Sequence, residues 1–271
     1  MKEISSKIRN SIALLTLTVI FVLAISGTAS ADPYVGGQNL TTVKNGTVSG
    51  GLYEDTYYGF NNSETPANVT YNFKSLPSNA QVKSATLYTG VYSGHMQEPK
   101  DTYVKITFNG QNIANEFLTS TYTYPMGIGV SRALIMNDHC NRATSDYFMW
   151  YDVTGLVRQN NKVNIDTTGS FDGRIKHITL VIAYDDGDSD IIRYWVNVGH
   201  DADNYYTDDE LGIDYVGRTN FVSALPSGSN VQSATLKAIH MASQDGSYTF
   251  NNHVLPNSNP QASFSGSNTW N

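Results

Sequence analysis

The stretch LPSNAQVKSATLYTG, from Leu76 to Gly90, returns late in the chain as LPSGSNVQSATLKAI, from Leu225 to Ile239. The two segments align without a gap and share Leu-Pro-Ser, then a valine, then Ser-Ala-Thr-Leu. In both, a Pro-Ser turn precedes a short run that is typical of a β-strand. A turn and strand that recur within one chain indicate two copies of one structural unit.

Other segments alternate between apolar and polar residues. This period of two runs through Tyr103–Phe108 (YVKITF), His177–Tyr184 (HITLVIAY) and Ile191–Val198 (IIRYWVNV), and indicates strands with one polar face. Turn residues such as Asn109-Gly110 and Asp245-Gly246 separate such runs. We therefore predict an all-β fold of tandem antiparallel β-sandwich units, similar to jelly rolls.

The repeat predicts where the units lie: a first sandwich over residues 32–188 and a second, partial one over residues 189–271. In the first, the repeated strand is followed by Asn109-Gly110 and later by Trp150. In the second, the same order gives Asn251-Asn252 and then Trp270, so Trp270 is expected to correspond to Trp150. The strands that close the first unit have no counterpart before Asn271, and the second unit is expected to be incomplete.

An incomplete sandwich exposes apolar side chains and unpaired strand edges. Three explanations remain open. The sequence is a fragment of a longer protein, a neighbouring subunit donates the missing strand, or an N-terminal segment such as Thr42–Leu52 completes the unit within the chain.

The N-terminus has the layout of a secretory signal peptide. Three basic residues precede an apolar run from Ile12 to Ile25, and the small residues Ala29-Ser30-Ala31 follow it. The run is shorter than the roughly 20 apolar residues that a membrane-spanning helix needs. We expect cleavage after residue 31, and a secreted or cell-surface protein with no membrane span after cleavage.

The chain is acidic, with 17 Lys and Arg against 24 Asp and Glu. This charge argues against nucleic acid and anionic membranes as partners, because both attract basic surfaces. The single cysteine, Cys140, excludes an intrachain disulfide, so stability must come from packing. A buried, unreactive thiol is favoured over a bond between two chains or a metal pair with His139.

Asn-x-Ser/Thr glycosylation motifs cluster near the start of the mature chain, at Asn39, Asn45, Asn61 and Asn68. In an exported protein they indicate a glycosylated region that faces solvent. Chance occurrence in a sequence rich in Asn and Thr is the alternative.

Carboxylates are the best candidates for a metal site. Asp185, Asp186, Asp188 and Asp190 fall in one turn, and calcium takes six to eight oxygen ligands from such loops. Their spacing does not match the EF-hand loop, so a solvated acidic turn is the alternative. A second group of acids spans residues 201–210. Calcium is the one candidate cofactor.

The sequence contains none of the zinc-protease, nucleophile-elbow, P-loop or dinucleotide-binding motifs. The six histidines are scattered, and structural roles are favoured for them. The 18 tyrosines fit strand surfaces, subunit contacts or stacking on sugars. We expect no enzymatic activity.

Four segments together resemble a known family: Val48–Phe60, Ser84–His95, Trp150–Val157 and Ile191–Asp203. The family consists of secreted methanogen proteins and is catalogued only as a domain of unknown function. The resemblance implies an archaeal cell-surface protein and no known reaction. The order of the strands is also similar to jelly-roll carbohydrate-binding modules, which is an analogy of fold alone.

These observations predict a non-enzymatic structural or adhesive protein of an archaeal envelope, in a surface layer, sheath or extracellular assembly. Its expected partners are other surface-protein subunits or cell-surface glycans. The alternative is a carbohydrate-binding module associated with polysaccharide processing.

Overall fold

The computed structural model describes residues 35–59, 67–92, 101–119, 131–170, 172–203, 216–223, 225, 229–241, 247–256 and 265–271. The predicted signal peptide lies outside these residues. The elements are β1 (Val35–Val48), β2 (Gly51–Tyr58), β3 (Asn68–Asn72), β4 (Gln81–Tyr92), β5 (Thr102–Phe108), β6 (Gln111–Leu118), β7 (Ser131–Arg132), β8 (Leu134–Asn137), β9 (Cys140–Ala143), β10 (Asp146–Asp152), the 3-10 turn η1 (Thr154–Leu156), β11 (Lys162–Gly169), β12 (Ile175–Asp185), β13 (Ile192–Asp203), β14 (Leu236–Met241), β15 (Thr249–Phe250), β16 (His253–Val254) and β17 (Ser265–Trp270).

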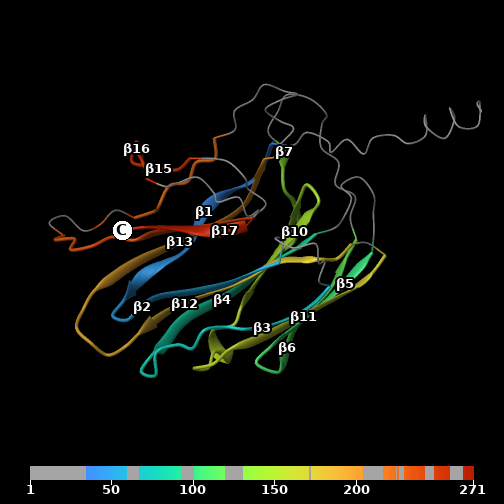
Figure 1. The fold of residues 1–271 in the computed structure, drawn as a ribbon, viewed down its shortest axis with the longest axis horizontal. Coiled ribbons are helices and arrows are strands. Elements are labelled where there is room, and N and C mark those ends of the chain that lie inside the picture. Colours follow the sequence, from blue (N-terminus) through green and yellow to red (C-terminus); the bar gives the residue numbers. More distant parts are fainter. Residues whose placement is uncertain are drawn as a thin grey trace, which may run out of the picture.

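Two antiparallel sheets form a sandwich. One has the strand order β2-β12-β4-β10-β9-β8, and the other has the order β3-β11-β5-β6. Figure 1 shows β3, β11 and β6 below the layer that contains β2, β12 and β4. The prediction of an all-β antiparallel sandwich is confirmed.

The core lies between these two sheets and follows the predicted alternation. Val104, Ile106 and Phe108 of β5 are buried, whereas Tyr103 and Lys105 point to solvent. Across the core, Ile178, Leu180 and Ile182 of β12 are fully buried. Each such side chain contributes about 1.5–3 kcal/mol when it leaves water, so these strands hold the two sheets together.

A third layer covers the outer face of the six-stranded sheet. It is the three-stranded sheet β13-β1-β7, in which β1 and β13 form a long ribbon. The ring centroids of His200 in β13 and Phe148 in β10 lie 5.8 Å apart. Phe148 also stacks on Tyr88 and on His177, with ring centroids 6.0 Å and 5.8 Å apart. Because apolar and aromatic groups fill both faces of the six-stranded sheet, its strands are buried more evenly than those of a two-layer sandwich.

The ribbon joins the two predicted units. β1 belongs to predicted unit 32–188, and it pairs antiparallel with β13 of unit 189–271 from Val35↔Asp203 to Val48↔Ile192. β1 also makes a short parallel pairing with β7, which the antiparallel prediction did not include. The boundary at residue 188 stays a prediction. The N-terminal strand β1 forms backbone hydrogen bonds with β7, which precedes this boundary, and with β13, which follows it.

The repeated strands pair in the same way. β4 pairs antiparallel with β10, and β14 pairs antiparallel with β17. Leu87 stands opposite Tyr151, and its repeat equivalent Leu236 stands opposite Trp270. Trp270 therefore corresponds in register to Tyr151, one position after the expected Trp150.

The turns of the repeat are also alike. Asn109 and Gly110 have φ values of 50° and 85°, and Asn251 and Asn252 have 48° and 66°. Two consecutive positive φ angles are those of a type I′ hairpin turn, which Asn and Gly adopt at least cost. Each copy thus consists of a strand, a type I′ hairpin and a returning strand. Among the described residues, no helix is both long enough and apolar enough to cross a membrane.

Candidate interaction surface

Equivalent positions of the repeat have opposite environments. Leu76 is 4% exposed, but its counterpart Leu225 is 45% exposed. Phe108, in the sequence Thr-Phe-Asn before the first hairpin turn, is fully buried, whereas Phe250 of the same triplet in the second copy is 43% exposed. Two residues that are buried in the first copy are thus partly exposed in the second.

The first copy shows what is missing. β4 has β10 on one edge and β12 on the other, and its inner face packs on the four-stranded sheet. β14 has β17 on one edge, and no strand in the described part of the chain pairs with its other edge. The buried ring nitrogens of His240 also find no hydrogen-bond partner among the described residues. That the second unit is incomplete stays a prediction.

We use the name repeat surface for Leu225, Val231, Ile239 and Phe250. All four are exposed apolar residues of the second copy. A second apolar edge lies at the end of the six-stranded sheet, where Leu134 and Ile135 of the terminal strand β8 are exposed. Soluble monomers seldom leave core-type side chains and unpaired strand edges open together.

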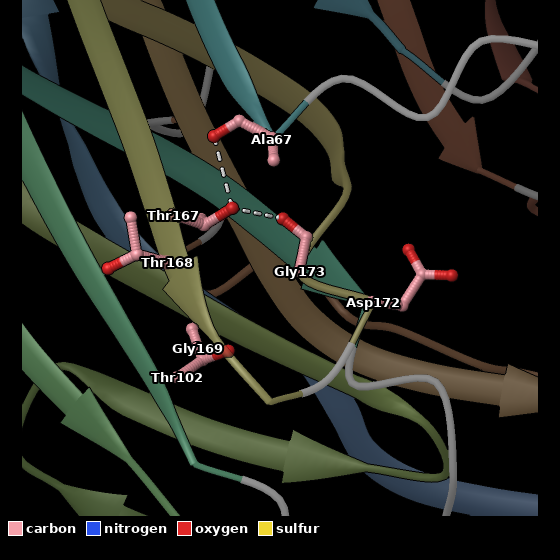
Figure 2. Close-up of a pocket in the computed structure, with 7 residues that line it drawn as sticks. All are labelled: Ala67, Thr102, Thr167, Thr168, Gly169, Asp172 and Gly173. Carbon is pink, nitrogen blue, oxygen red and sulfur yellow. Dashed lines mark hydrogen bonds between the residues drawn. The ribbon is translucent and has the colours of Figure 1, made fainter.

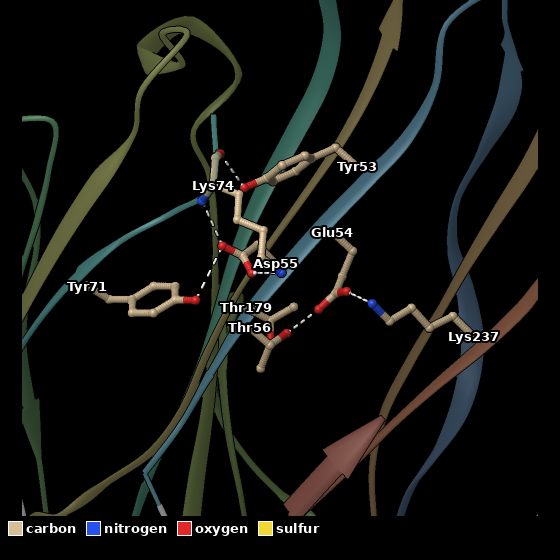
Figure 3. A network of polar contacts seen from close by, with 8 residues as sticks. All are labelled: Tyr53, Glu54, Asp55, Thr56, Tyr71, Lys74, Thr179 and Lys237. Atoms are coloured by element: carbon tan, nitrogen blue, oxygen red, sulfur yellow. Dashed lines mark hydrogen bonds and ion pairs between the residues drawn. The ribbon is translucent and has the colours of Figure 1, made fainter. Parts of the chain in front are cut away.

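The second copy is attached to the sandwich by polar contacts (Figure 3). Lys237 of β14 forms an ion pair with Glu54 of β2, and Glu54 also accepts a hydrogen bond from Thr56. Thr56 in turn lies 3.0 Å from Thr179 of β12, oxygen to oxygen. This chain of contacts links the repeated strand to the middle layer.

Polar contacts of the neighbouring Asp55 fix β2 against the segment that contains Tyr71 and Lys74. The buried carboxylate of Asp55 accepts hydrogen bonds from the Lys74 backbone at 2.8 Å and from the Tyr71 hydroxyl at 3.3 Å, and it pairs with the Lys74 ammonium at 3.2 Å. Burial, with the nearby Asp55 charge, raises the pKa of Tyr71 to about 12. Tyr71 therefore stays a neutral donor at physiological pH.

A second attachment runs through residues 219–222. Asn197 of β13 donates to Thr219, Thr219 donates to the Leu40 carbonyl at 2.9 Å, and the Trp195 indole donates to the Val222 carbonyl. The N-terminal strand β1 therefore contacts residues of the predicted second unit, and that it completes this unit stays a prediction. It pairs with β13 and β7, not with β14.

The acidic turn is held by contacts within the chain. Asp185 pairs with Lys83 at 2.7 Å and accepts from the Ser49 backbone at 3.0 Å, and the hydrogen bond from Lys83 lowers the pKa of Asp185. Asp186 and Asp188 each accept the backbone N–H two residues ahead. Desolvation and the adjacent Asp188 carboxylate raise the pKa of Asp190. No group of three or more potential metal ligands converges within the described residues, so calcium binding stays a prediction.

The predicted glycosylation sites that the structure describes are exposed: Asn39 and Asn45 on β1, and Asn68 at the start of β3. Asn61 lies outside the described residues. Cys140 is completely buried, and burial raises the pKa of its thiol to about 12, which keeps it protonated and unreactive.

One polar cluster combines residues that sequence reasoning did not connect. His139 Nε2 lies 2.8 Å from Glu116 of β6, and the Tyr151 hydroxyl of β10 donates to the same Glu116 oxygen at 3.2 Å. Asp138 contacts the other ring nitrogen. Burial opposes protonation of the ring, but the hydrogen bonds that the ring donates to both carboxylates raise the pKa of His139. The cluster joins the edges of the two sheets, which is a structural role.

A small polar pocket lies at one end of the sandwich (Figure 2). It has a volume of about 330 Å³ and is lined by Ala67, Thr102, Thr167, Thr168, Gly169, Asp172 and Gly173. Its carboxylate, Asp172, is paired with Arg174 at 2.7 Å, and Thr167 is hydrogen-bonded to the Gly173 carbonyl at 2.6 Å. These side chains are engaged with one another, and the pocket lacks a set of acid, base and nucleophile.

Comparison with protein families identifies the chain. A family model described as "Protein of unknown function (DUF3344)" matches residues 33–271, and the chain belongs to this family. The match begins two residues after Ala31, where the predicted signal peptide ends, and it includes both copies of the repeat. No curated protein matches the sequence.

Proposed function

We propose that this protein is a non-enzymatic structural or adhesive component of an archaeal cell surface, and that its copies assemble through the repeat surface. One observation carries the proposal: residues that are buried in the first copy of the repeat, such as Leu76 and Phe108, are exposed in the second copy as Leu225 and Phe250. The resemblance of four sequence segments to secreted methanogen proteins supports the location.

The partner is a second copy of the same chain. The first copy of the repeat shows that its strand is covered by a neighbour on each edge, and β14 has a neighbour on one edge only among the described residues. The β8 edge, with exposed Leu134 and Ile135, offers an apolar strand of the required kind. Strand addition supplies backbone hydrogen bonds, and alternate side chains supply specificity.

Pairing of the repeat surface with the β8 edge is head-to-tail, because the two surfaces belong to different parts of the molecule. Head-to-tail contacts continue from copy to copy and form filaments or layers unless the rotation closes a ring. Such growth suits a sheath or surface layer. Exposed Asn39, Asn45 and Asn68 and the acidic composition support a location outside the cell.

The test uses two variants, each with one surface removed. Val231→Lys with Ile239→Lys changes the repeat surface, and Ile135→Lys changes the β8 edge. In sedimentation velocity, the wild type is expected to form large species and each variant to remain a monomer. A mixture of the two variants is expected to form dimers and to stop there, because each dimer has lost both of its free surfaces.

The control is Leu52→Lys, an exposed position on β2 that belongs to neither surface, and it is expected to assemble as the wild type does. If Ile135→Lys still assembles while the repeat-surface variant does not, the contact is between two repeat surfaces, and the head-to-tail arrangement is wrong. A wild type that is monomeric at all concentrations contradicts the proposal as a whole.

A further inference from the structure

The outer face of the four-stranded sheet has an unusual composition for a solvent-exposed surface. Tyr103 of β5 and Phe117 of β6 stand directly opposite each other, are 57% and 49% exposed, and have ring centroids 4.8 Å apart at an angle of 30°. The two rings form one apolar platform. Cross-strand aromatic pairs stabilise a sheet, but this pair leaves about half of each side chain in water.

The glycosylation motif at Asn68 lies on the same face. The register places Asn68 of β3 opposite Asp166 of β11, Asp166 opposite Lys105 of β5, and Lys105 opposite Asn115 of β6. These four side chains form one row across the sheet. Tyr103 and Phe117 occupy the neighbouring row, two residues along their strands.

The side-chain amide of Asn68 is directed over the sheet. Its Nδ2, the atom that carries the sugar in an N-glycan, donates to Asp166 at 3.2 Å, and its Oδ1 accepts from Asn164 at 3.2 Å. Both partners belong to β11, the neighbour of edge strand β3. A sugar on Nδ2 therefore starts above β11 and not beyond the edge of the sheet.

The distance suits a short oligosaccharide. Strands lie about 4.8 Å apart and advance about 3.4 Å per residue, so the rings are about 12–16 Å from Asn68. The groups along the way are hydrogen-bonding side chains: Asp166, Lys105 and Thr168. Sugar hydroxyls bind such groups, and the C–H face of a pyranose packs on an aromatic ring and removes apolar surface from water.

We infer that the N-linked glycan of Asn68 folds back over the four-stranded sheet and packs on Tyr103 and Phe117. The glycan covers the apolar platform of the sandwich and leaves the repeat surface free for assembly. The inference rests on export of the chain, which is part of the proposed function, and not on assembly.

The experiment uses the glycoprotein purified from a host that exports and N-glycosylates it. Glycopeptide mass spectrometry establishes whether Asn68 is occupied. Thermal unfolding then compares the wild type, Asn68→Gln, the ring variant Tyr103→Leu with Phe117→Leu, and the combination of all three. The control Asn39→Gln removes a motif on β1, which belongs to a different sheet.

We expect an occupied Asn68 and a melting temperature about 2–4 °C lower for the ring variant than for the glycosylated wild type. The same ring substitutions in the Asn68→Gln background are expected to cause a clearly smaller shift, and Asn39→Gln is expected to leave the full shift in place. Sugar ring protons shifted upfield in NMR spectra, and returned to normal in the ring variant, would support the contact directly.

Three results overturn the inference. If Asn68 is not glycosylated, no glycan is present to pack on Tyr103 and Phe117. Equal effects of the ring substitutions with and without the Asn68 glycan mean that the rings only stabilise the sheet. Binding of free oligosaccharides to the glycosylated wild type through these rings means that the platform is open. None of these results bears on self-association, which sedimentation measures separately.

Discussion

Leu76 and Leu225 are equivalent residues of the two Leu-Pro-Ser sequences, and Leu76 is buried in the core whereas Leu225 is partly exposed to solvent. The backbone N–H of Leu76 donates to the Gln159 carbonyl at 2.9 Å, which fixes the turn against the loop after η1. The side chain of Leu225 is 45% exposed. The equivalent residues Leu87 and Leu236 both belong to strands, β4 and β14, so similar local sequence gives a strand in both copies while the surrounding elements decide burial.

This difference predicts unequal effects of the same substitution. Leu76→Ala is expected to lower the free energy of unfolding by about 2–5 kcal/mol, because it leaves a cavity in the core. Leu225→Ala is expected to change it by less than about 1 kcal/mol in the monomer, because an exposed side chain has little packing to lose. Urea unfolding of both variants at low protein concentration measures the two values. Equal costs would mean that the second copy has its own core.

The ion pair between Glu54 and Lys237 predicts that charge sets how the second copy sits on the sandwich. Lys237→Glu places two carboxylates together and is expected to increase protease cleavage within residues 229–271, while the melting temperature of the sandwich changes little. Lys237 is partly exposed, so we expect the pair to contribute about 1 kcal/mol at most. Glu54→Lys combined with Lys237→Glu is expected to restore protection. An unchanged rate of cleavage in both the single and the double variant would contradict a role for this ion pair in attaching the second copy.

Two buried histidines predict sensitivity to acid. Burial lowers the pKa of His177 to about 3 and of His200 to about 4, against 6.5 in an unfolded chain. Both rings are neutral in the fold and gain protons more readily when unfolded. Their contribution to stability is therefore full above pH 6.5 and is lost as pH falls toward 4.

The expected loss is about 2 kcal/mol per histidine at pH 4.5. His177→Phe with His200→Gln is expected to flatten the decline of the melting temperature between pH 6.5 and pH 4.5, since Phe can keep the stacking on Phe148. Matched melting curves at several pH values measure the slope. An unchanged slope in the double variant would assign the acid sensitivity to the carboxylates instead.

The acidic turn predicts a calcium effect if the turn binds the ion. At a calcium concentration of 100 times Kd, binding stabilises the fold by about 2.7 kcal/mol, which is a shift of several degrees. Asp186→Asn with Asp188→Asn is expected to abolish the shift, because it neutralises two of the three carboxylates of the turn that do not pair with Lys83. Lack of any calcium-dependent shift in the wild type refutes the calcium hypothesis.

The sequence predicts the fold well wherever local pattern decides it. Alternation places Val104, Ile106 and Phe108 in the core, and both Asn-containing hairpin turns form where expected. The correspondence of Trp270 is displaced by one position, because pairing register depends on cross-strand packing that a single sequence does not reveal. The third layer was not predicted, since β1 and β13 meet across more than 140 residues of sequence.

Less of the candidate interaction surface could be predicted from the sequence. The repeat predicts an incomplete second unit, but the exposure of Leu225 and Phe250 depends on which elements surround them in space. The ion pair of Glu54 with Lys237 and the alignment of Asn68 with Tyr103 and Phe117 depend on strand order. No sequence motif connects the residues of the ion pair or those of the alignment, so neither relationship could be predicted from the sequence.

The central claim is that the second copy of the repeat is an interaction surface, and sedimentation velocity of the exported wild-type chain over a range of concentrations tests it most directly. The account predicts a sedimentation coefficient that rises with concentration, and its collapse to the monomer value in Val231→Lys with Ile239→Lys. A monomer value at every concentration, equal for wild type and variant, would contradict it.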